Sequence, residues 1–230
     1  MYTVVNPEIR KNKEGSGLMA DKVIESNVVT VYGTVTTKPE FSHEMYGEDF
    51  YTVYLEVPRL SEITDILPVT ISERLMLGIS IDIGTKILVE GQLRSYNKYQ
   101  DGNNKLILTV FARNLKVLEQ EVKNPNQIFL DGFICKKPVY RTTPFGREIT
   151  DMLLAVNRPY NKSDYIPCIA WGRNARYSEN LKVGDRIRIW GRIQSRNYQK
   201  KLSEDQIITR TAYEVSISKM EVFDTEKGFS

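Results

Sequence analysis

Residues 184–198, GDRIRIWGRIQSRNY, decide the fold class because apolar and basic residues alternate along their first half. The alternation places isoleucines on one face and arginines on the other, which predicts a half-buried β-strand with a basic outer face. Gly191 interrupts this strand, and so does Gly132 in an earlier β-rich stretch. A glycine inside a strand often marks a bulge or a tight bend at a barrel corner. We therefore expect a closed β-structure.

The same pattern occurs earlier in the chain, at residues 84–98, GTKILVEGQLRSYNK. The identities at an offset of 100 residues are Gly84/Gly184, Ile87/Ile187, Gly91/Gly191, Ser95/Ser195 and Asn97/Asn197. Upstream, an offset of 99 matches Asn27/Asn126, Gly33/Gly132, Lys38/Lys137, Pro39/Pro138, Gly47/Gly146, Leu55/Leu154, Val57/Val156, Arg59/Arg158, Asp65/Asp164 and Pro68/Pro167. Self-similarity at a fixed period indicates a repeated architecture. We predict an N-terminal arm (1–26), two repeats (27–122 and 126–223) and a short C-terminal tail (224–230), with a linker at 123–125.

Each repeat predicts five strands and one short helix between the third and fourth strands. In the second repeat the strands are expected at 127–137, 149–156, 165–171, 186–196 and 206–222, with the helix at 174–181. In the first repeat they are expected at 28–37, 50–57, 66–71, 85–95 and 105–118, with the helix at 72–79. Pro167 lacks an N–H for a ladder, which predicts an edge or bulged strand there. This element order is that of a Greek-key OB-fold barrel, so the fold class is all-β with two tandem OB-folds.

The residues that enzymes and metal sites require do not form a pattern here. The single histidine, His43, lies in a polar turn, and Cys135 and Cys168 have no metal-ligand spacing. No glycine-rich phosphate loop and no nucleophile motif accompanies them. We predict a binding protein, not an enzyme, with no cofactor and no metal.

No apolar run approaches the roughly 18 residues of a membrane span, and residues 1–16 do not resemble a secretory signal. Two cysteines give no disulfide framework, so a reducing, cytoplasmic location fits best. Residues 1–125 hold 14 Lys+Arg and 17 Asp+Glu, whereas residues 126–230 hold 18 and 12. The net charges of −3 and +6 make the second half the candidate surface for a polyanion.

Aromatic residues are interleaved with basic ones between residues 153 and 200. Proteins that bind single strands combine a basic groove with aromatic rings on which bases stack. Tyr160 and Tyr198 lie at expected hairpin tips, where a tyrosine has little core to join. The sequence leaves open whether Trp190 belongs to the core or to the groove.

The second half resembles the bacterial single-stranded DNA-binding protein family at three stretches: LLAVNRPY (153–160), DYIPCIAWGR (164–173) and LKVGD (181–185) continuing to GRIQSRNY (191–198). The resemblance implies that Tyr160, Tyr165, Trp171 and Tyr198 stack on bases. It also implies that basic residues follow the strand path, and the candidates are Lys137, Arg158, Arg173, Arg192 and Arg196. The implied ligand is single-stranded DNA, and OB grooves accept RNA as well.

The first half matches that family only through the repeat, which sets Ser61, Ile66, Ser72 and Lys98 opposite the four aromatics. Tyr96 and Tyr99 are partial substitutes, and the favoured reading is a divergent barrel kept for dimer geometry or partner contacts. The resemblance implies a homodimer with four barrels. The family's long acidic tail has no counterpart after residue 223, so recruitment of replication enzymes through it is not expected. The alternative function is a primosome-type OB module that binds proteins and contacts nucleic acid weakly.

Overall fold

The computed structural model describes residues 25–59, 61, 63–100, 102–201 and 207–223. Its first half contains β1 (Asn27–Val35), β2 (Glu40–Met45), β3 (Glu48–Pro58), β4 (Thr64–Ser72), α1 (Glu73–Met76), β5 (Lys86–Gln100) and β6 (Asn103–Val117). The second half contains β7 (Asn126–Ile134), β8 (Val139–Thr142), β9 (Glu148–Arg158), β10 (Lys162–Trp171), α2 (Arg173–Ser178), β11 (Arg186–Lys201) and β12 (Ile207–Phe223). Residues 1–24 of the predicted N-terminal arm and the predicted C-terminal tail (224–230) lie outside the described residues.

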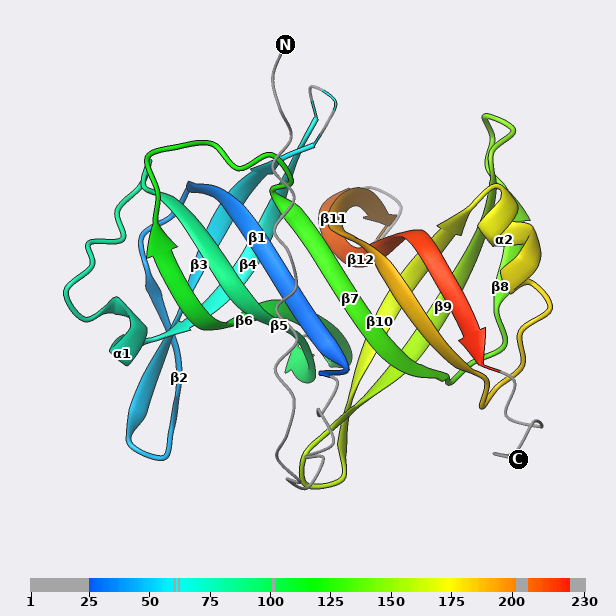
Figure 1. Ribbon diagram of the computed structural model, residues 1–230, viewed down its shortest axis with the longest axis horizontal. Coiled ribbons are helices and arrows are strands. Elements are labelled where there is room, and N and C mark those ends of the chain that lie inside the picture. The colour runs from blue at the N-terminus through cyan, green and yellow to red at the C-terminus, as the bar shows by residue number, and fades with distance from the viewer. Residues whose placement is uncertain (1–24, 60, 62, 101, 202–206, 224–230) are drawn as a thin grey trace, which may run out of the picture.

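The two halves form two barrels side by side along the long axis of the molecule (Figure 1). Barrel 1 comprises β1–β6 and barrel 2 comprises β7–β12. In each barrel the first strand pairs with the third, β1 with β3 and β7 with β9, which closes the sheet. The helix follows the fourth strand, β4 or β10, which pairs in parallel with the last strand. The prediction of an all-β fold with tandem barrels and two short helices is confirmed.

Each barrel has six strand segments where the sequence predicted five. The additional segments are β2 and β8, which pair only with the strand that follows them, β3 and β9. The turn between β2 and β3 uses positive φ at Tyr46 (56°) and Gly47 (76°), and Gly146 at the equivalent tip has φ 74°. The repeat identity of Gly47 and Gly146 marks these turns in the sequence, but β2 has no clear apolar pattern, since all six of its residues are exposed.

The prediction of an edge or bulged strand at Pro167 is wrong, since the ladder of β10 with β9 runs without a register shift. Pro167 lies in the interior of the sheet order, because β10 stands between β9 and β12. However, the pairing of β10 with β12 is recorded only at Cys168 and Ile169, the two residues that follow the proline. The missing N–H therefore falls where the strand has no recorded partner on that side, and Pro68 takes the same place in β4.

Glycine is required where strands of one barrel approach most closely. A Cβ built on Gly191 would lie 2.2 Å from the Ser216 carbonyl oxygen, and one on Gly91 would lie 2.1 Å from that of Phe111. The ladder changes register at both places, between Trp190 and Gly191 and between Glu90 and Gly91. The predicted bulge at Gly191 is confirmed. At Gly132 the contact is with the Ala155 carbonyl oxygen, 2.7 Å from an added Cβ, which marks the bend where β7 crosses to β9.

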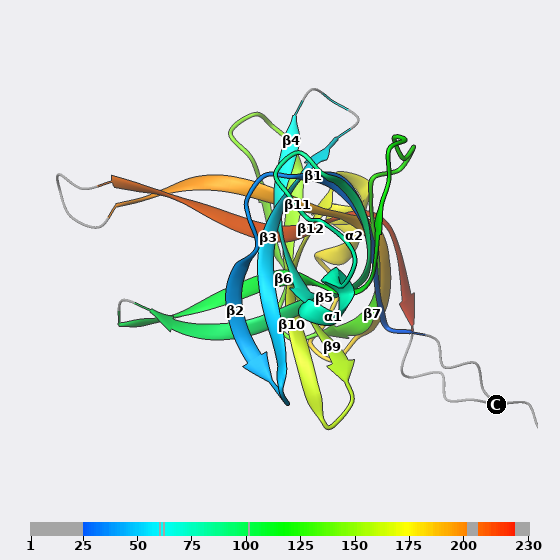
Figure 2. The ribbon, with the colours of Figure 1, turned by 90° about the vertical axis from the view of Figure 1, so that its left-hand side faces the viewer.

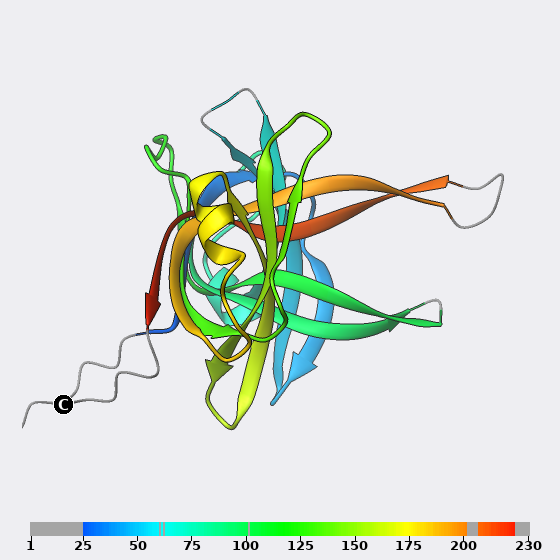
Figure 3. The ribbon, with the colours of Figure 1, turned by 90° about the vertical axis from the view of Figure 1, so that its right-hand side faces the viewer.

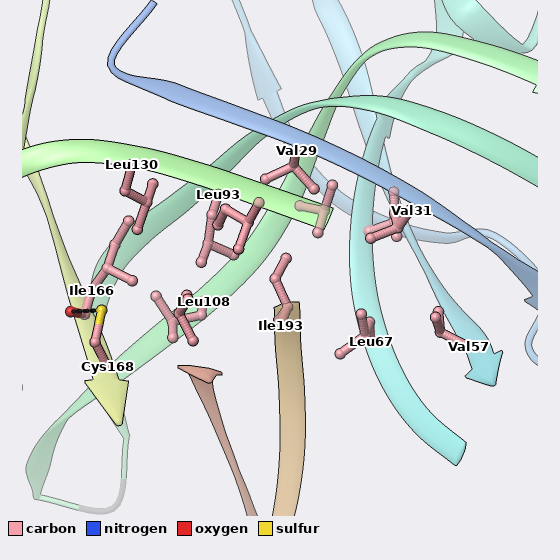
Figure 4. Packing of buried hydrophobic residues seen from close by; sticks show 14 of the residues in the cluster. Val29, Val31, Val57, Leu67, Leu93, Leu108, Leu130, Ile166, Cys168 and Ile193 are labelled. Atoms are coloured by element: carbon pink, nitrogen blue, oxygen red, sulfur yellow. Dashed lines mark hydrogen bonds between the residues drawn. The ribbon is translucent and has the colours of Figure 1, made fainter. Parts of the chain in front are cut away.

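The barrels are joined by antiparallel pairing of β1 with β7. The register runs from Asn27 opposite Leu130 to Val31 opposite Asn126. These two pairs exchange under the repeat, so the junction has a local pseudo-two-fold axis. Buried apolar residues of both barrels form one cluster at this junction, in which Val29 and Leu93 lie near Leu130 and Ile193 (Figure 4).

A second, reciprocal contact fastens the junction. The Asp65 carboxylate of barrel 1 accepts hydrogen bonds from the Ser195 backbone N–H (2.7 Å) and hydroxyl (3.2 Å) of barrel 2. In the opposite direction, Asp164 of barrel 2 accepts from the Ser95 backbone N–H of barrel 1 (2.6 Å). Both carboxylates are fully buried. Buried charges require such partners, so the repeated Asp and Ser residues fix how the barrels sit against each other.

The last two strands of each barrel, β5 and β6 or β11 and β12, extend beyond it as a hairpin. Figures 2 and 3 show the β5–β6 and β11–β12 hairpins extending from the same side of the molecule. Tyr96 and Tyr99 are exposed on the first hairpin and Tyr198 on the second.

Candidate nucleic-acid interface

A groove of about 480 Å³ lies on barrel 2 beside the junction with barrel 1. Its walls come from the end of β10, the outer face of β11, β12 and the turn before β9. Its lining residues are Arg59, Arg147, Trp171, Arg192, Gln194, Ser195, Arg196 and Ser216. Four arginines and one tryptophan therefore face a single cavity.

Strand β11 supplies the basic floor of the groove through its alternation. Ile193 points into the core and is almost fully buried. Arg192 and Arg196 lie on the opposite face, because residues separated by an even number share a face of a strand. The register shift at Gly191 leaves this alternation intact, because the unpaired residue at the shift is Ser218 of β12, and Ile187 and Ile189 are buried on the same face of β11 as Ile193.

Trp171 is the last residue of β10 and lies half-buried at the end of the groove. Its indole Nε1 donates a hydrogen bond to the Ser216 hydroxyl (3.2 Å). Because the polar atom of the ring is satisfied and the orientation of the ring is fixed, the exposed part of the indole can receive a flat apolar group without a further polar cost.

The groove carries an excess of positive charge. Asp65 pairs with Arg59 at 2.6 Å, and Glu214 lies 3.9 Å from Arg196. Arg192 lies 4.0 Å from Asp65, and no described carboxylate forms an ion pair with Arg147. Burial, together with the neighbouring Arg59, lowers the pKa of Arg192. The groove therefore has more positive than negative charge and attracts an anionic ligand.

The other predicted aromatics are exposed but do not line this groove. Tyr165 lies on the same face of β10 as Trp171, at a distance along the strand of about 20 Å. Tyr160 forms the β9–β10 turn with φ 62° and is 95% exposed. Tyr198 shares its face of β11 with Arg192 and Arg196. None of these rings points into the core, and their stacking roles stay predictions.

The remaining predicted basic residues lie apart from the groove. Arg158 lies 3.3 Å from the buried Asp164 at the junction. Arg173 is the exposed first residue of α2, and Lys137 is exposed just before β8. Their contacts with nucleic acid also stay predictions, although Arg158 has a structural partner that the sequence did not reveal.

Two arginines of the groove were not predicted. Arg59 comes from barrel 1, whose net negative charge pointed away from nucleic acid, and its repeat relationship with Arg158 was the available signal. Arg147 follows the turn glycine Gly146, and no pattern in the sequence singles it out. Trp190, left open by the sequence, belongs to neither core nor groove: it packs against Phe129 (5.2 Å between ring centroids) beneath the Lys219 ammonium (4.4 Å).

The described residues contain no group of three or more His, Cys, Asp or Glu side chains arranged to hold a metal ion. Among them there is also no helix with the length and apolar character needed to cross a membrane.

The second half of the chain is similar to a known family. The Single-strand binding protein family matches residues 125–223. Single-stranded DNA-binding protein A of Bacillus subtilis is 33% identical over 96 residues, which cover 39% of this chain and 56% of that protein. The chain spans about half the length of the curated relatives it matches.

Solved structures resemble the fold of both barrels. The single-stranded DNA binding protein from Thermus aquaticus has a TM-score of 0.69 and 23% sequence identity, covering 89% of this chain and 96% of its own. This similarity confirms the tandem OB-fold. The N-terminal domain of PriB protein from Thermoanaerobacter tencongensis, solved as a dimer, is 55% identical and covers 42% of this chain and 100% of its own. Its TM-score of 0.38 is too low to support an argument from its fold.

Proposed function

We propose that this chain, whose residues 125–223 are a domain of the single-strand binding protein family, binds single-stranded DNA without sequence preference. The observation that carries the proposal is the groove of barrel 2, where Trp171 and four arginines face one cavity. The relatives are named for the same ligand. The general roles that accompany this activity are DNA replication, recombination and repair.

Two physical effects supply the binding. Arginine guanidinium groups neutralise phosphates and release the counterions condensed on the strand. A base that lies flat on Trp171 adds about 1–3 kcal/mol, and every base offers a π-face. Neither effect reads base edges, so affinity is tolerant of sequence. Tyr160, Tyr165 and Tyr198 extend the platform beyond the groove in this proposal.

The salt dependence of binding to labelled oligonucleotides tests the proposal. Affinity for oligo-dT should fall steeply as salt rises, and mixed sequences of the same length should bind with similar affinity. Binding that survives high salt unchanged, or that requires one sequence, would contradict it. An RNA oligomer of the same sequence measures the preference between the two polymers.

The finer assignments belong to the same proposal. The relatives belong to a family of binding proteins, and we infer that this chain likewise performs no catalysis. We also infer a cytoplasmic location and a homodimer that brings four barrels together. Sedimentation of the purified chain should give twice the monomer mass.

A protein-contact role for barrel 1 is the second candidate. Its β2–β3 hairpin exposes Phe41 (61%) and Tyr46 (98%) beside Glu40, Glu44 and Glu48. Exposed rings in an acidic setting suit a basic protein surface and repel phosphates. If this role dominates, substitution of Trp171 should leave the physiological interaction intact.

A further inference from the structure

A second hollow continues the groove of barrel 2 toward barrel 1. It measures about 660 Å³ and shares Arg59, Arg192 and Ser216 with the groove. From these shared residues it runs along residues 124–127, which are the end of the interbarrel linker and the start of β7, and past Pro58 and Ser61 of barrel 1. The two hollows therefore form one trough, and Arg59 and Arg192 stand where its two parts meet.

Arg59 and Arg192 are contributed by different barrels and share one carboxylate. Arg59 donates two hydrogen bonds to Asp65 (2.8 and 2.6 Å), whereas Arg192 lies 4.0 Å from Asp65 and donates instead to the Gln194 side chain (3.3 Å). The trio thus carries one positive charge in excess. Arg192 is 38% exposed and keeps donors that no carboxylate occupies.

The pseudo-equivalent half of the junction differs at these positions. There Asp164 pairs with both Arg94 (3.1 Å) and Arg158 (3.3 Å), whose side chains are only 20% and 27% exposed. Barrel 1 has Gln92 where barrel 2 has Arg192, and Arg94 where barrel 2 has Gln194. The Arg192 guanidinium of barrel 2 is therefore more exposed than the Arg94 guanidinium of barrel 1, and only the half of the junction with Arg192 offers free donors to an anion.

We propose that Arg59 and Arg192 together hold a backbone phosphate, so that the bound strand leaves barrel 2 along the linker and crosses to barrel 1. This inference rests on the proposed function of the groove and adds the direction of the strand. A phosphate fits because it carries the missing negative charge and offers oxygens to planar, forked donors. Barrel 1 then takes part in binding through Arg59, although its own counterpart of the groove lacks the tryptophan.

The test uses Arg59→Gln in the full chain, with Arg94→Gln as the matched control, since Arg94 is as exposed as Arg59 and pairs with the equivalent Asp164. Each substitution removes one arginine from a fully buried aspartate, so thermal unfolding should shift similarly in both. Binding to oligo-dT long enough to cover both barrels should weaken at least about threefold in Arg59→Gln. The slope of log affinity against log salt should become shallower by about 0.7, the value for one lost phosphate contact on a single strand. Arg94→Gln should keep the parent slope.

A second variant covers the case in which Arg59→Gln fails to fold. Gln127 is exposed in the trough and its backbone is paired with Thr30. Gln127→Glu adds a negative charge without a change of shape and should weaken binding several-fold. Asn180→Asp adds the same charge after α2, outside both hollows, and should have no effect.

Equal slopes for the two arginine variants, or equal affinities for Gln127→Glu and Asn180→Asp, would overturn the proposed path. The proposed function fails separately: in that case the parent chain itself would not bind oligo-dT at low salt.

Discussion

The two barrels share one backbone plan and differ in the chemistry of their outer surfaces. Where barrel 2 has Trp171, Arg192 and Arg147, barrel 1 has Ser72, Gln92 and Glu48. The residues that the repeats have in common are instead those that shape strands and fasten the junction. Duplication has therefore kept the frame in both halves, while the groove chemistry is found in one.

The shared asparagines illustrate this division. Asn27 hydrogen-bonds the Leu93 backbone N–H (2.9 Å) and carbonyl (2.8 Å), and Asn126 makes the same pair of bonds to Ile193 (2.9 and 2.7 Å). Each amide bridges the first strand of its barrel, β1 or β7, to the fifth, β5 or β11, just after the bulge. Identity between repeats thus reports backbone requirements, and differences between repeats indicate where a ligand binds.

The largest effect should come from the shared frame. Gly91→Ala and Gly191→Ala each drive a Cβ against a carbonyl oxygen of the neighbouring strand, and overpacking of this kind costs about 3 kcal/mol or more. Chemical denaturation should show similar losses of unfolding free energy for the two variants. A tolerated Gly91→Ala beside a damaging Gly191→Ala would mean that the barrels do not share this constraint.

The next largest effect should be a loss of DNA affinity that occurs in variants of barrel 2 and not in those of barrel 1. Trp171→Ala removes the stacking ring and should weaken oligo-dT binding by about 1–3 kcal/mol, or roughly five- to a hundred-fold. Ser72→Ala at the equivalent position of barrel 1 should leave affinity unchanged. Fluorescence anisotropy of a labelled oligonucleotide measures both, and equal losses would place the binding surface elsewhere.

Charge at the equivalent hairpin turns gives a smaller contrast. Arg147→Glu reverses a charge that lines the groove and should weaken binding by about 1 kcal/mol at low salt, with a shallower salt dependence. Glu48→Arg in barrel 1 breaks only an exposed pair with Arg74 (2.8 Å) and should not weaken binding. Weakened binding in Glu48→Arg would show that the acidic hairpin assists the strand.

The smallest effect concerns the stability of barrel 2 as a function of pH. Despite burial, hydrogen bonds from Arg186 and Arg188 (2.9 and 2.8 Å) lower the pKa of Asp131. A lowered folded-state pKa adds stability above the unfolded value of about 3.9, and this stability is lost as pH falls through the folded value. Asp131→Asn should lower the melting temperature by about 2–4 °C at pH 7, and the difference should shrink toward pH 3.

Barrel 1 has Tyr32 at that position, so its stability contains no equivalent pH-dependent contribution. A Tyr32→Phe variant serves as the control and should show the same shift at both pH values. A constant difference for Asp131→Asn across the pH range would contradict the role of the arginine pair.

Much of the fold could be predicted because its signals are local or periodic. Alternation in residues 184–198, the strand glycines and the repeat identities lead to tandem barrels. The exposed strands β2 and β8 were not predicted, because β2 has no apolar face and β8 has only four residues.

The site was predicted less completely because it depends on contacts between distant residues. Arg59 reaches the groove only because Asp65 meets Ser195, 130 residues away in the chain. Arg158 is predicted from the sequence as a DNA contact, whereas its ion pair with the buried Asp164 cannot be recognised from the sequence. Trp171, Arg192 and Arg196 were predicted through the family resemblance of the second half, and the structure brings all three to one groove.

The central claim is that bases stack on Trp171 in the groove of barrel 2. Trp190→Phe keeps the aromatic contact with Phe129 and leaves Trp171 as the single tryptophan, so its fluorescence reports the groove alone. Titration of this variant with oligo-dT at low salt should quench the emission to a saturating limit and reverse when salt is added. An emission that stays constant while the oligonucleotide binds would contradict the claim.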